Sequence, residues 1–167
     1  MAEQKKKIEE IIVDSVDGEL QKNALEFIAC VRENKLFITT KNYANGEYVI
    51  KYKGKGVCNV WIGKGYFNAI PFADFTDEFE KYMKNLNLLE MLWKNQKKCP
   101  PCNPRVCAPQ AGKSEEEFDG FDNTVLGKKF TDTCKFVRTW FRNPGAEEFE
   151  CLKAMMEYKV QSIMIGT

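Results

Sequence analysis

The chain has 167 residues, of which 44% are hydrophobic and 29% are charged, a balance typical of a folded domain and not of a disordered chain. The 25 basic and 24 acidic side chains leave a formal charge of +1, so charge gives no reason to expect nucleic acid or an anionic membrane as a partner. The chain contains no histidine. This excludes a Ser-His-Asp or Cys-His nucleophile system and any histidine ligand to a metal.

The N-terminal region indicates a cytoplasmic protein. A basic cluster at Lys5–Lys7 is not followed by an apolar signal core, and no apolar run approaches the roughly 20 residues of a membrane-spanning helix. The seven cysteines are an odd number, which does not suit a secreted disulfide scaffold. We therefore expect a cytoplasmic location, no membrane partner, and thiols that are kept reduced.

Residues 1–16 form a charged, weakly helical segment, and residues 17–167 are predicted to form a single domain. Asp17 is a suitable N-cap for a helix that runs to about Asn34. Apolar residues follow one another along this helix at the spacing of an amphipathic stripe. They are Leu20, Ala24, Phe27, Ile28 and Val31.

The next part of the chain changes to the short period of β-strands. Four segments are rich in β-branched and aromatic residues, and glycine-bearing turns separate them. The segments are Leu36–Asn42, Glu47–Lys53, Val57–Ile62 and Tyr66–Ile70, and the turns are Ala44–Gly46, Gly54–Gly56 and Gly63–Gly65. Three tight turns in series predict an antiparallel meander of about four strands.

Helices are predicted after this meander as well, so the fold class is α+β. Asp74–Glu78 begins one helical segment with an acidic first turn, and Leu86–Lys97 forms a second. A cysteine-bearing loop then spans about 98–134 and is loop-like to about Asp122. Asn123–Leu126 and Lys135–Phe141 are candidates for further short strands. Asn143 is predicted to cap the last helix, with Pro144 at its first position.

Three cysteines fall within nine residues of the predicted loop, at Cys99, Cys102 and Cys107. A C-x2-C turn offers two thiolates to a metal, and Pro100 and Pro101 stiffen this one before binding. Cys107 would be a third ligand, and Cys134 is the best candidate for a fourth. Four sulfurs with no open position predict a structural zinc site, although iron is an alternative.

Two other interpretations of these thiols stay open. Cys99 and Cys102 could act as a redox dithiol in a thiol-based redox or metal-responsive protein. A reactive C-x-x-C thiol normally precedes a helix, and Asn103 with Pro104 argues against a helix starting there. The thiols could also be ordinary loop residues or form a disulfide under some conditions. The remaining cysteines, Cys30, Cys58 and Cys151, are predicted to be small buried apolar residues.

Aromatic residues on the meander and after it could line an apolar pocket, although ordinary core packing explains them too. They are Tyr43, Tyr48, Tyr52, Trp61, Tyr66, Phe67, Trp93 and Trp140.

Five segments of the chain resemble a family of small cysteine-cluster proteins from clostridia and related Firmicutes bacteria, to which no activity is assigned. They are Phe27–Lys35, Tyr52–Cys58, Cys99–Cys107, Leu126–Cys134 and Asn143–Cys151, within residues 20–157. The resemblance implies a bacterial source. It also implies Cys134, and not Cys151, as the fourth ligand.

The sequence therefore favours a non-catalytic binding module with a structural zinc, whose sheet face or groove takes a small molecule or a peptide. An enzyme that uses carboxylates, lysine or tyrosine remains an alternative, since acid–base chemistry does not require histidine.

Overall fold

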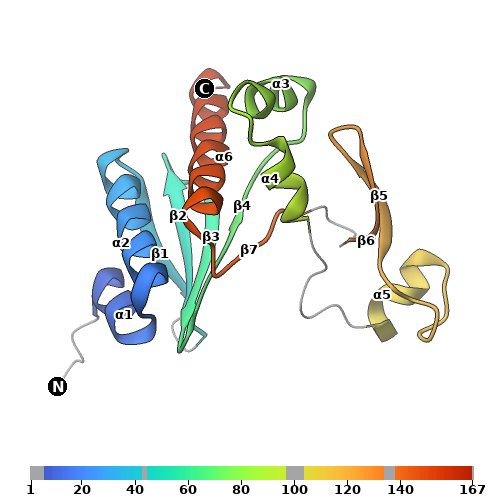
Figure 1. Ribbon diagram of the computed structural model, residues 1–167, viewed down its shortest axis with the longest axis horizontal. Coiled ribbons are helices and arrows are strands. Elements are labelled where there is room, and N and C mark those ends of the chain that lie inside the picture. Colours follow the sequence, from blue (N-terminus) through green and yellow to red (C-terminus); the bar gives the residue numbers. More distant parts are fainter. Residues whose placement is uncertain (1–5, 43–44, 97–103, 134–137, 167) are drawn as a thin grey trace. The chain divides into compact units, whose positions relative to one another are not determined.

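The computed structural model describes residues 6–42, 45–96, 104–133 and 138–166 (Figure 1). They fall into two compact units, which we describe separately. The first unit is formed by Met1–Ala73 and Phe141–Thr167, and the second by Asp74–Trp140. The single domain expected for residues 17–167 stays a prediction.

The first unit is built on the predicted antiparallel meander, with one further strand at its edge. The strand order is β1-β2-β3-β4-β7, and each strand is antiparallel to its neighbours. The strands are β1 (Phe37–Asn42), β2 (Glu47–Tyr52), β3 (Lys55–Gly63), β4 (Tyr66–Pro71) and β7 (Phe141–Arg142). The predicted α+β class and the four-strand meander are confirmed.

Turns form near all three predicted positions, but the middle one lies at Lys53–Gly54, and Lys55 and Gly56 of the predicted turn belong to β3. Gly46, Gly54 and Gly65 have φ of +60°, +80° and +76°, which side chains with a Cβ rarely adopt. Between β2 and β3, Lys53 also has a positive φ of +47°. Two consecutive left-handed residues form the kind of hairpin turn whose twist matches that of the strands.

Three helices belong to this unit: α1 (Ile8–Ser15), α2 (Gly18–Glu33) and α6 (Ala146–Ile165). α6 packs on β3 and β4 and also contacts α2, while α1 contacts α2 and β3 (Figure 1). Three buried phenylalanine rings join these elements. Phe27 of α2, Phe67 of β4 and Phe149 of α6 have ring centroids 5.4 to 6.0 Å apart.

The start of α6 differs from the prediction. The helix begins at Ala146 with Gly145 as N-cap, two residues later than the predicted cap at Asn143. Asn143 instead has a left-handed φ of +44° and joins the last segment to β4. Its backbone N–H donates to the carbonyl of Phe67 at 2.8 Å, and its side-chain oxygen accepts from the Phe67 N–H at 2.9 Å. Asn143 therefore pairs with a strand that is distant in the sequence. A capping rule that considers only neighbouring residues does not take such a contact into account.

The second unit contains α3 (Asp77–Asn85), α4 (Leu89–Lys94), α5 (Pro104–Ala111) and the hairpin of β5 (Phe121–Val125) with β6 (Lys128–Thr133). α3 has the predicted acidic first turn, and the hydroxyl of Thr76 caps it by accepting from Phe79 N–H at 3.2 Å. α4 is shorter than the predicted Leu86–Lys97. Asn87, with φ of +57°, separates it from α3.

The prediction of loop from residue 98 to about Asp122 was wrong where α5 forms. Pro104 occupies the first helical position, where its missing N–H is harmless and its fixed φ suits the helix. Ala108, Gln110 and Ala111 are residues that tolerate or favour helix. The preference of proline for the first position of a helix, which was used to predict the start of the last helix at Pro144, therefore applies at Pro104.

No helix in the part of the chain that the structure describes combines the length and the apolar character needed to cross a membrane.

The close approach of β2 and β3 at Gly46 leads to a stability prediction. A Cβ at Gly46 would collide with the carbonyl of Ile62, whereas one at Gly54 would meet nothing within 4 Å, although both glycines have positive φ. We expect Gly46→Ala to lower the free energy of unfolding by more than about 3 kcal/mol, and Gly54→Ala by about 1 kcal/mol. Urea denaturation measures both values. Equal losses for the two variants would contradict the close packing at Gly46.

Candidate functional site

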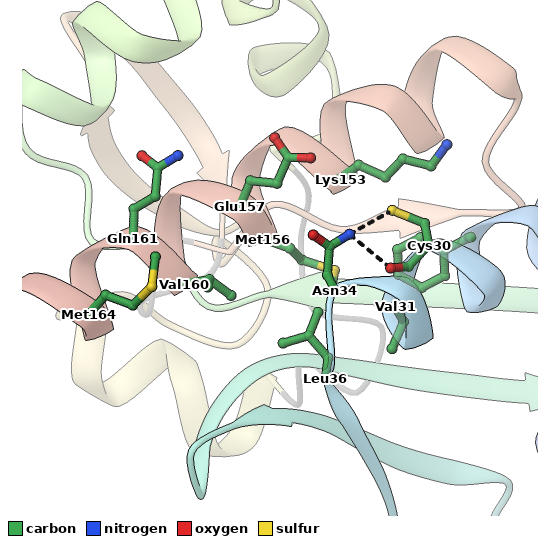
Figure 2. A pocket seen from close by; sticks show the side chains of 11 residues that line it. Cys30, Val31, Asn34, Leu36, Lys153, Met156, Glu157, Val160, Gln161 and Met164 are labelled. Carbon is green, nitrogen blue, oxygen red and sulfur yellow. Dashed lines mark hydrogen bonds between the residues drawn. The ribbon is translucent and has the colours of Figure 1, made fainter.

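A groove of about 250 Å³ lies in the first unit, between the C-terminal end of α2 and the second half of α6 (Figure 2). Two sets of residues line it. From α2 and the residues after it come Phe27, Cys30, Val31, Asn34 and Leu36, and from α6 come Lys153, Met156, Glu157, Val160, Gln161 and Met164.

The apolar lining of the groove consists of core residues that continue outward from the packed interior. Phe27, Val31, Leu36 and Met156 are all buried. Leu36 reaches this position because the chain reverses after α2: Lys35 has φ of +56°, and Leu36 N–H donates to the carbonyl of Val31 at 3.0 Å. A helix end of this kind brings the residue beyond it back against the last turn.

Cys30 lines the groove and is half-exposed, so the prediction of a buried Cys30 was wrong. The amide of Asn34 donates to the Cys30 carbonyl at 2.9 Å and to its sulfur at 3.5 Å (Figure 2). Partial burial raises the pKa of the Cys30 thiol; the ammonium of Lys153 opposes this rise, and the carboxylate of Glu157 adds to it. The thiol is therefore protonated at neutral pH and is a poor nucleophile.

The cationic side chain of the groove, Lys153, is already paired. Its Nζ lies 2.7 Å from Oε1 of Glu150, one turn earlier on the same helix. Burial opposes the charge on Lys153, but the hydrogen bond and charge of Glu150 outweigh this and raise the pKa of the amine. The Lys153 ammonium thus stays positively charged, and the carboxylate of Glu150 on the same helix compensates this charge.

The prediction of burial is confirmed for the other two cysteines. Cys58 on β3 and Cys151 on α6 are fully buried. Burial raises the pKa of Cys151 to about 12 and that of Cys58 further. Both thiols are inert parts of the core.

Three of the four predicted metal ligands, Cys99, Cys102 and Cys134, lie outside the described residues. The fourth, Cys107, is half-buried on α5. Among the described residues, no three His, Cys, Asp or Glu side chains gather in a group that could hold a metal ion. The four-cysteine site stays a prediction.

The structure does hold together the residues that flank these cysteines. Gln96 and Thr139 form an antiparallel bridge, and the Gln96 amide donates to the Thr139 hydroxyl at 2.7 Å. Next to this bridge, Trp140 N–H donates to the carbonyl of Asn95 at 2.8 Å. The three polar residues of the pairing are all buried. The backbone just before the segment that contains Cys99 therefore lies beside the backbone just after the segment that contains Cys134.

The aromatic residues considered for a pocket do not line this groove, but Tyr48 and Tyr66 line a second hollow beside α1. Tyr48 and Phe67 are buried in the core of the first unit, and Tyr43 lies outside the described residues. Trp93 and Trp140 belong to the second unit. Trp93 donates to the Val125 carbonyl at 2.9 Å. The aromatic residue that lines the groove is Phe27, which belongs to the predicted apolar stripe of a helix.

Sequence reasoning missed the groove because it is formed where two helices separated by more than a hundred residues come together. Phe27 and Val31 belong to the predicted apolar stripe of the first long helix, and Met156 and Val160 lie at apolar helical spacing on α6. Nothing in either stripe shows that their ends diverge enough to leave a cavity. The polar residues of the lining, among them Asn34 and Glu157, gave no signal of a cavity in the sequence.

The chain matches no protein-family model, no curated protein and no solved structure, so the family resemblance seen in the sequence stays a prediction.

Proposed function

We propose that this protein is a non-catalytic binding module that holds a small, largely apolar molecule in the groove between α2 and α6. The observation that carries the proposal is the groove itself, an apolar hollow with a few polar groups at its edge. Binding sites for small molecules commonly have this composition, because apolar burial supplies affinity and a few polar groups fix orientation.

The chemistry of the lining favours binding over catalysis. The ionisable residues that line the groove are Cys30, Lys153 and Glu157. The raised pKa of the Cys30 thiol disfavours the thiolate, and the Lys153 ammonium is paired with Glu150. A thiolate nucleophile or a neutral lysine base would need the deprotonated forms of Cys30 and Lys153 near neutral pH, so these two groups do not favour catalysis.

The size of the groove favours a small molecule over a peptide. Its volume of about 250 Å³ lies just below the roughly 300–1,000 Å³ of sites for drug-sized ligands. A single aliphatic chain or a small ring system suits such a space, whereas a peptide helix needs a longer groove.

Blocking the groove tests this function, and Cys30 is a built-in reporter. We expect 1-octanol to slow alkylation of Cys30 in the wild-type protein and to lose this effect in Val160→Trp, whose indole would fill the groove. Ile165→Trp is the matched control, because Ile165 lies on the same helix, outside the groove and 87% exposed. Peptide mass spectrometry after timed alkylation gives the rate with and without octanol. Protection that is absent in the wild type, or unchanged in Val160→Trp, would contradict the proposal.

We also propose that Cys99, Cys102, Cys107 and Cys134 hold a structural zinc in the second unit. The Gln96–Thr139 bridge supports this proposal. Cys99 follows Gln96 by three residues and Cys134 precedes Thr139 by five, so the chain can carry them at most about 11 Å and about 18 Å from the bridge. These limits allow Cys134 and the C-x2-C pair to reach the same metal ion.

A redox dithiol formed by Cys99 and Cys102 is the second candidate, and one observation favours it. α5 begins at Pro104, two residues after Cys102 in the sequence. The partial positive charge of a helix N-terminus lowers the pKa of a nearby thiol and makes it reactive. The absence of a helix here was the sequence argument against this chemistry, and that argument no longer holds.

Elemental analysis separates the two candidates for the cysteine cluster. We expect about one zinc per chain in protein purified without tags or chelators, since four thiolates complete a tetrahedral site. Cys102→Ser should lose the metal and lower thermal stability, while Cys30→Ser, the control, should keep it. Full occupancy in Cys102→Ser would contradict the ligand assignment. Metal-free protein with reversible oxidation of Cys99 and Cys102 would favour the dithiol.

A further inference from the structure

The second hollow, of about 650 Å³, lies beside α1 at the end of the sheet that carries the β1–β2 and β3–β4 turns. Backbone hydrogen bonds hold its three walls together. Gly65 N–H, in the β3–β4 turn, donates to the carbonyl of Ser15 at the end of α1 at 2.7 Å. Ile62 N–H donates to the carbonyl of Gly46 at 3.0 Å and joins β3 to the β1–β2 turn. The hollow is therefore a fixed feature of the first unit.

The ring of Tyr66 forms one side of this hollow and is held by the backbone. Tyr66 is paired with Gly63 across the β3–β4 hairpin. A Cβ at Gly63 would collide with the ring and the hydroxyl of Tyr66, so the ring occupies the space that a side chain there would fill. The residue is nevertheless 37% exposed and lines the hollow. One side of the ring thus rests on Gly63, and the exposed side is a prepared stacking surface.

Uncharged polar groups stand around this ring. The hydroxyl of Ser15, the amide of Asn45 and the hydroxyl of Tyr66 all belong to lining residues. In the part of the chain that the structure describes, these three groups form no hydrogen bond. Hydroxyl and amide groups both donate and accept, so the hollow offers donors as well as acceptors to a ligand.

The charged residues of the lining compensate each other. They are Lys6 and Asp14, and Nζ of Lys6 lies 2.7 Å from Oδ2 of Asp14. The other lining residues are uncharged, and Ile11 and Ile62 add apolar surface. A phosphate or carboxylate ligand would compete with Asp14 for the one ammonium group. The lining therefore favours an uncharged ligand.

From these features we infer that the second hollow binds a neutral carbohydrate. A pyranose ring has an apolar face of C–H groups and hydroxyl groups around its rim. The C–H face packs on the exposed side of the Tyr66 ring, and the hydroxyls exchange hydrogen bonds with Ser15 and Asn45. This site is separate from the groove between α2 and α6, so the inference does not depend on the function proposed for that groove.

Methyl β-D-glucopyranoside tests the inference, because its equatorial substituents leave axial C–H groups on both faces of the ring. In a ¹H–¹⁵N NMR titration we expect millimolar affinity and shifts of the amide signals of Gly46 and Gly63, which line the hollow. Gly54 is the matched control, because it lies in the β2–β3 turn at the other end of the sheet. No shifts up to about 50 mM glucoside, or equal shifts at Gly54, would overturn the inference.

Two other ligands test the class of molecule. Glycerol carries hydroxyls without a ring face, and indole has a ring face without hydroxyls. We expect both to shift Gly63 with at least about fivefold lower affinity than the glucoside, since each uses only part of the lining. Indole or glycerol binding as tightly as the glucoside would overturn the assignment to carbohydrates.

Variants of Tyr66 locate the ligand. Tyr66→Phe keeps the ring face and should stay within about threefold of the wild-type affinity, whereas Tyr66→Leu should bind about fivefold or more weakly. Tyr52→Leu is the control, because it removes a ring from β2 outside the hollow. Thermal melting identifies any variant that loses its fold, and Tyr66→Phe decides the outcome in that case: loss of binding there would contradict stacking. Unchanged affinity in a folded Tyr66→Leu would overturn the inference.

The result is independent of the octanol experiment. Glucoside shifts at Gly63 support the second hollow whether or not octanol protects Cys30. If the glucoside instead shifts the methyl signals of Met156 and Met164 and leaves Gly63 unchanged, it binds in the groove, and the inference is overturned.

Discussion

The contact among the rings of Phe27, Phe67 and Phe149 is the interaction on which the first unit depends. It joins a helix from the start of the chain, a strand from its middle and a helix from its end, and all three rings are buried. Clustered aromatic rings contribute large buried area and prefer tilted or edge-to-face geometry, as here. They fix α2 against α6 over the sheet, and the groove exists because the two helices separate beyond this contact.

Phe27 connects the core to the groove. Its ring packs against the other two phenylalanines and also lines the hollow between the helices. A ligand in the groove would therefore contact a ring that packs against residues of both β4 and α6. Few side chains of the protein would need to become ordered on binding. Preorganisation of this kind lowers the entropic cost of binding and makes a small groove sufficient.

The cysteines divide into groups with different chemical character, and burial accounts for the difference. Cys58 and Cys151 are enclosed by the core, and Cys30 stands at the edge of the groove with a protonated thiol. These three belong to the first unit. The clustered cysteines belong to the second unit, in which the bridge between Gln96 and Thr139 ties the flanking backbone together. The proposed ligand site and the proposed cysteine site therefore belong to different units.

The sequence predicted most of the first unit because its signals are local. Alternating strands, glycine turns at Gly46, Gly54 and Gly65, and the stripe of α2 all depend on residues near one another in the chain. The errors arose where distant contacts decide. Asn143 pairs with Phe67 and does not cap a helix, and Cys30 lines a cavity that only α6 completes.

The errors in the second unit have another origin. Asn87 adopts a left-handed conformation that excludes the start of the predicted helix Leu86–Lys97, and Pro104 opens a helix where loop was expected. Asparagine can adopt either a helical or a left-handed conformation, and proline can lie either in a loop or in the first turn of a helix. The surrounding fold selects between these conformations. The candidate groove could not be located from sequence because its two walls lie more than a hundred residues apart.

Methionine-methyl NMR tests the central claim, that the groove between α2 and α6 is a ligand site, most directly. Met156 and Met164 line the groove, whereas Met155 is buried elsewhere on the same helix and Met83 lies in the second unit. In a titration with 1-octanol, the account predicts shifts of the Met156 and Met164 resonances and none at Met155 or Met83. Shifts at Met83 without any at Met156, or no shifts at all, would contradict it.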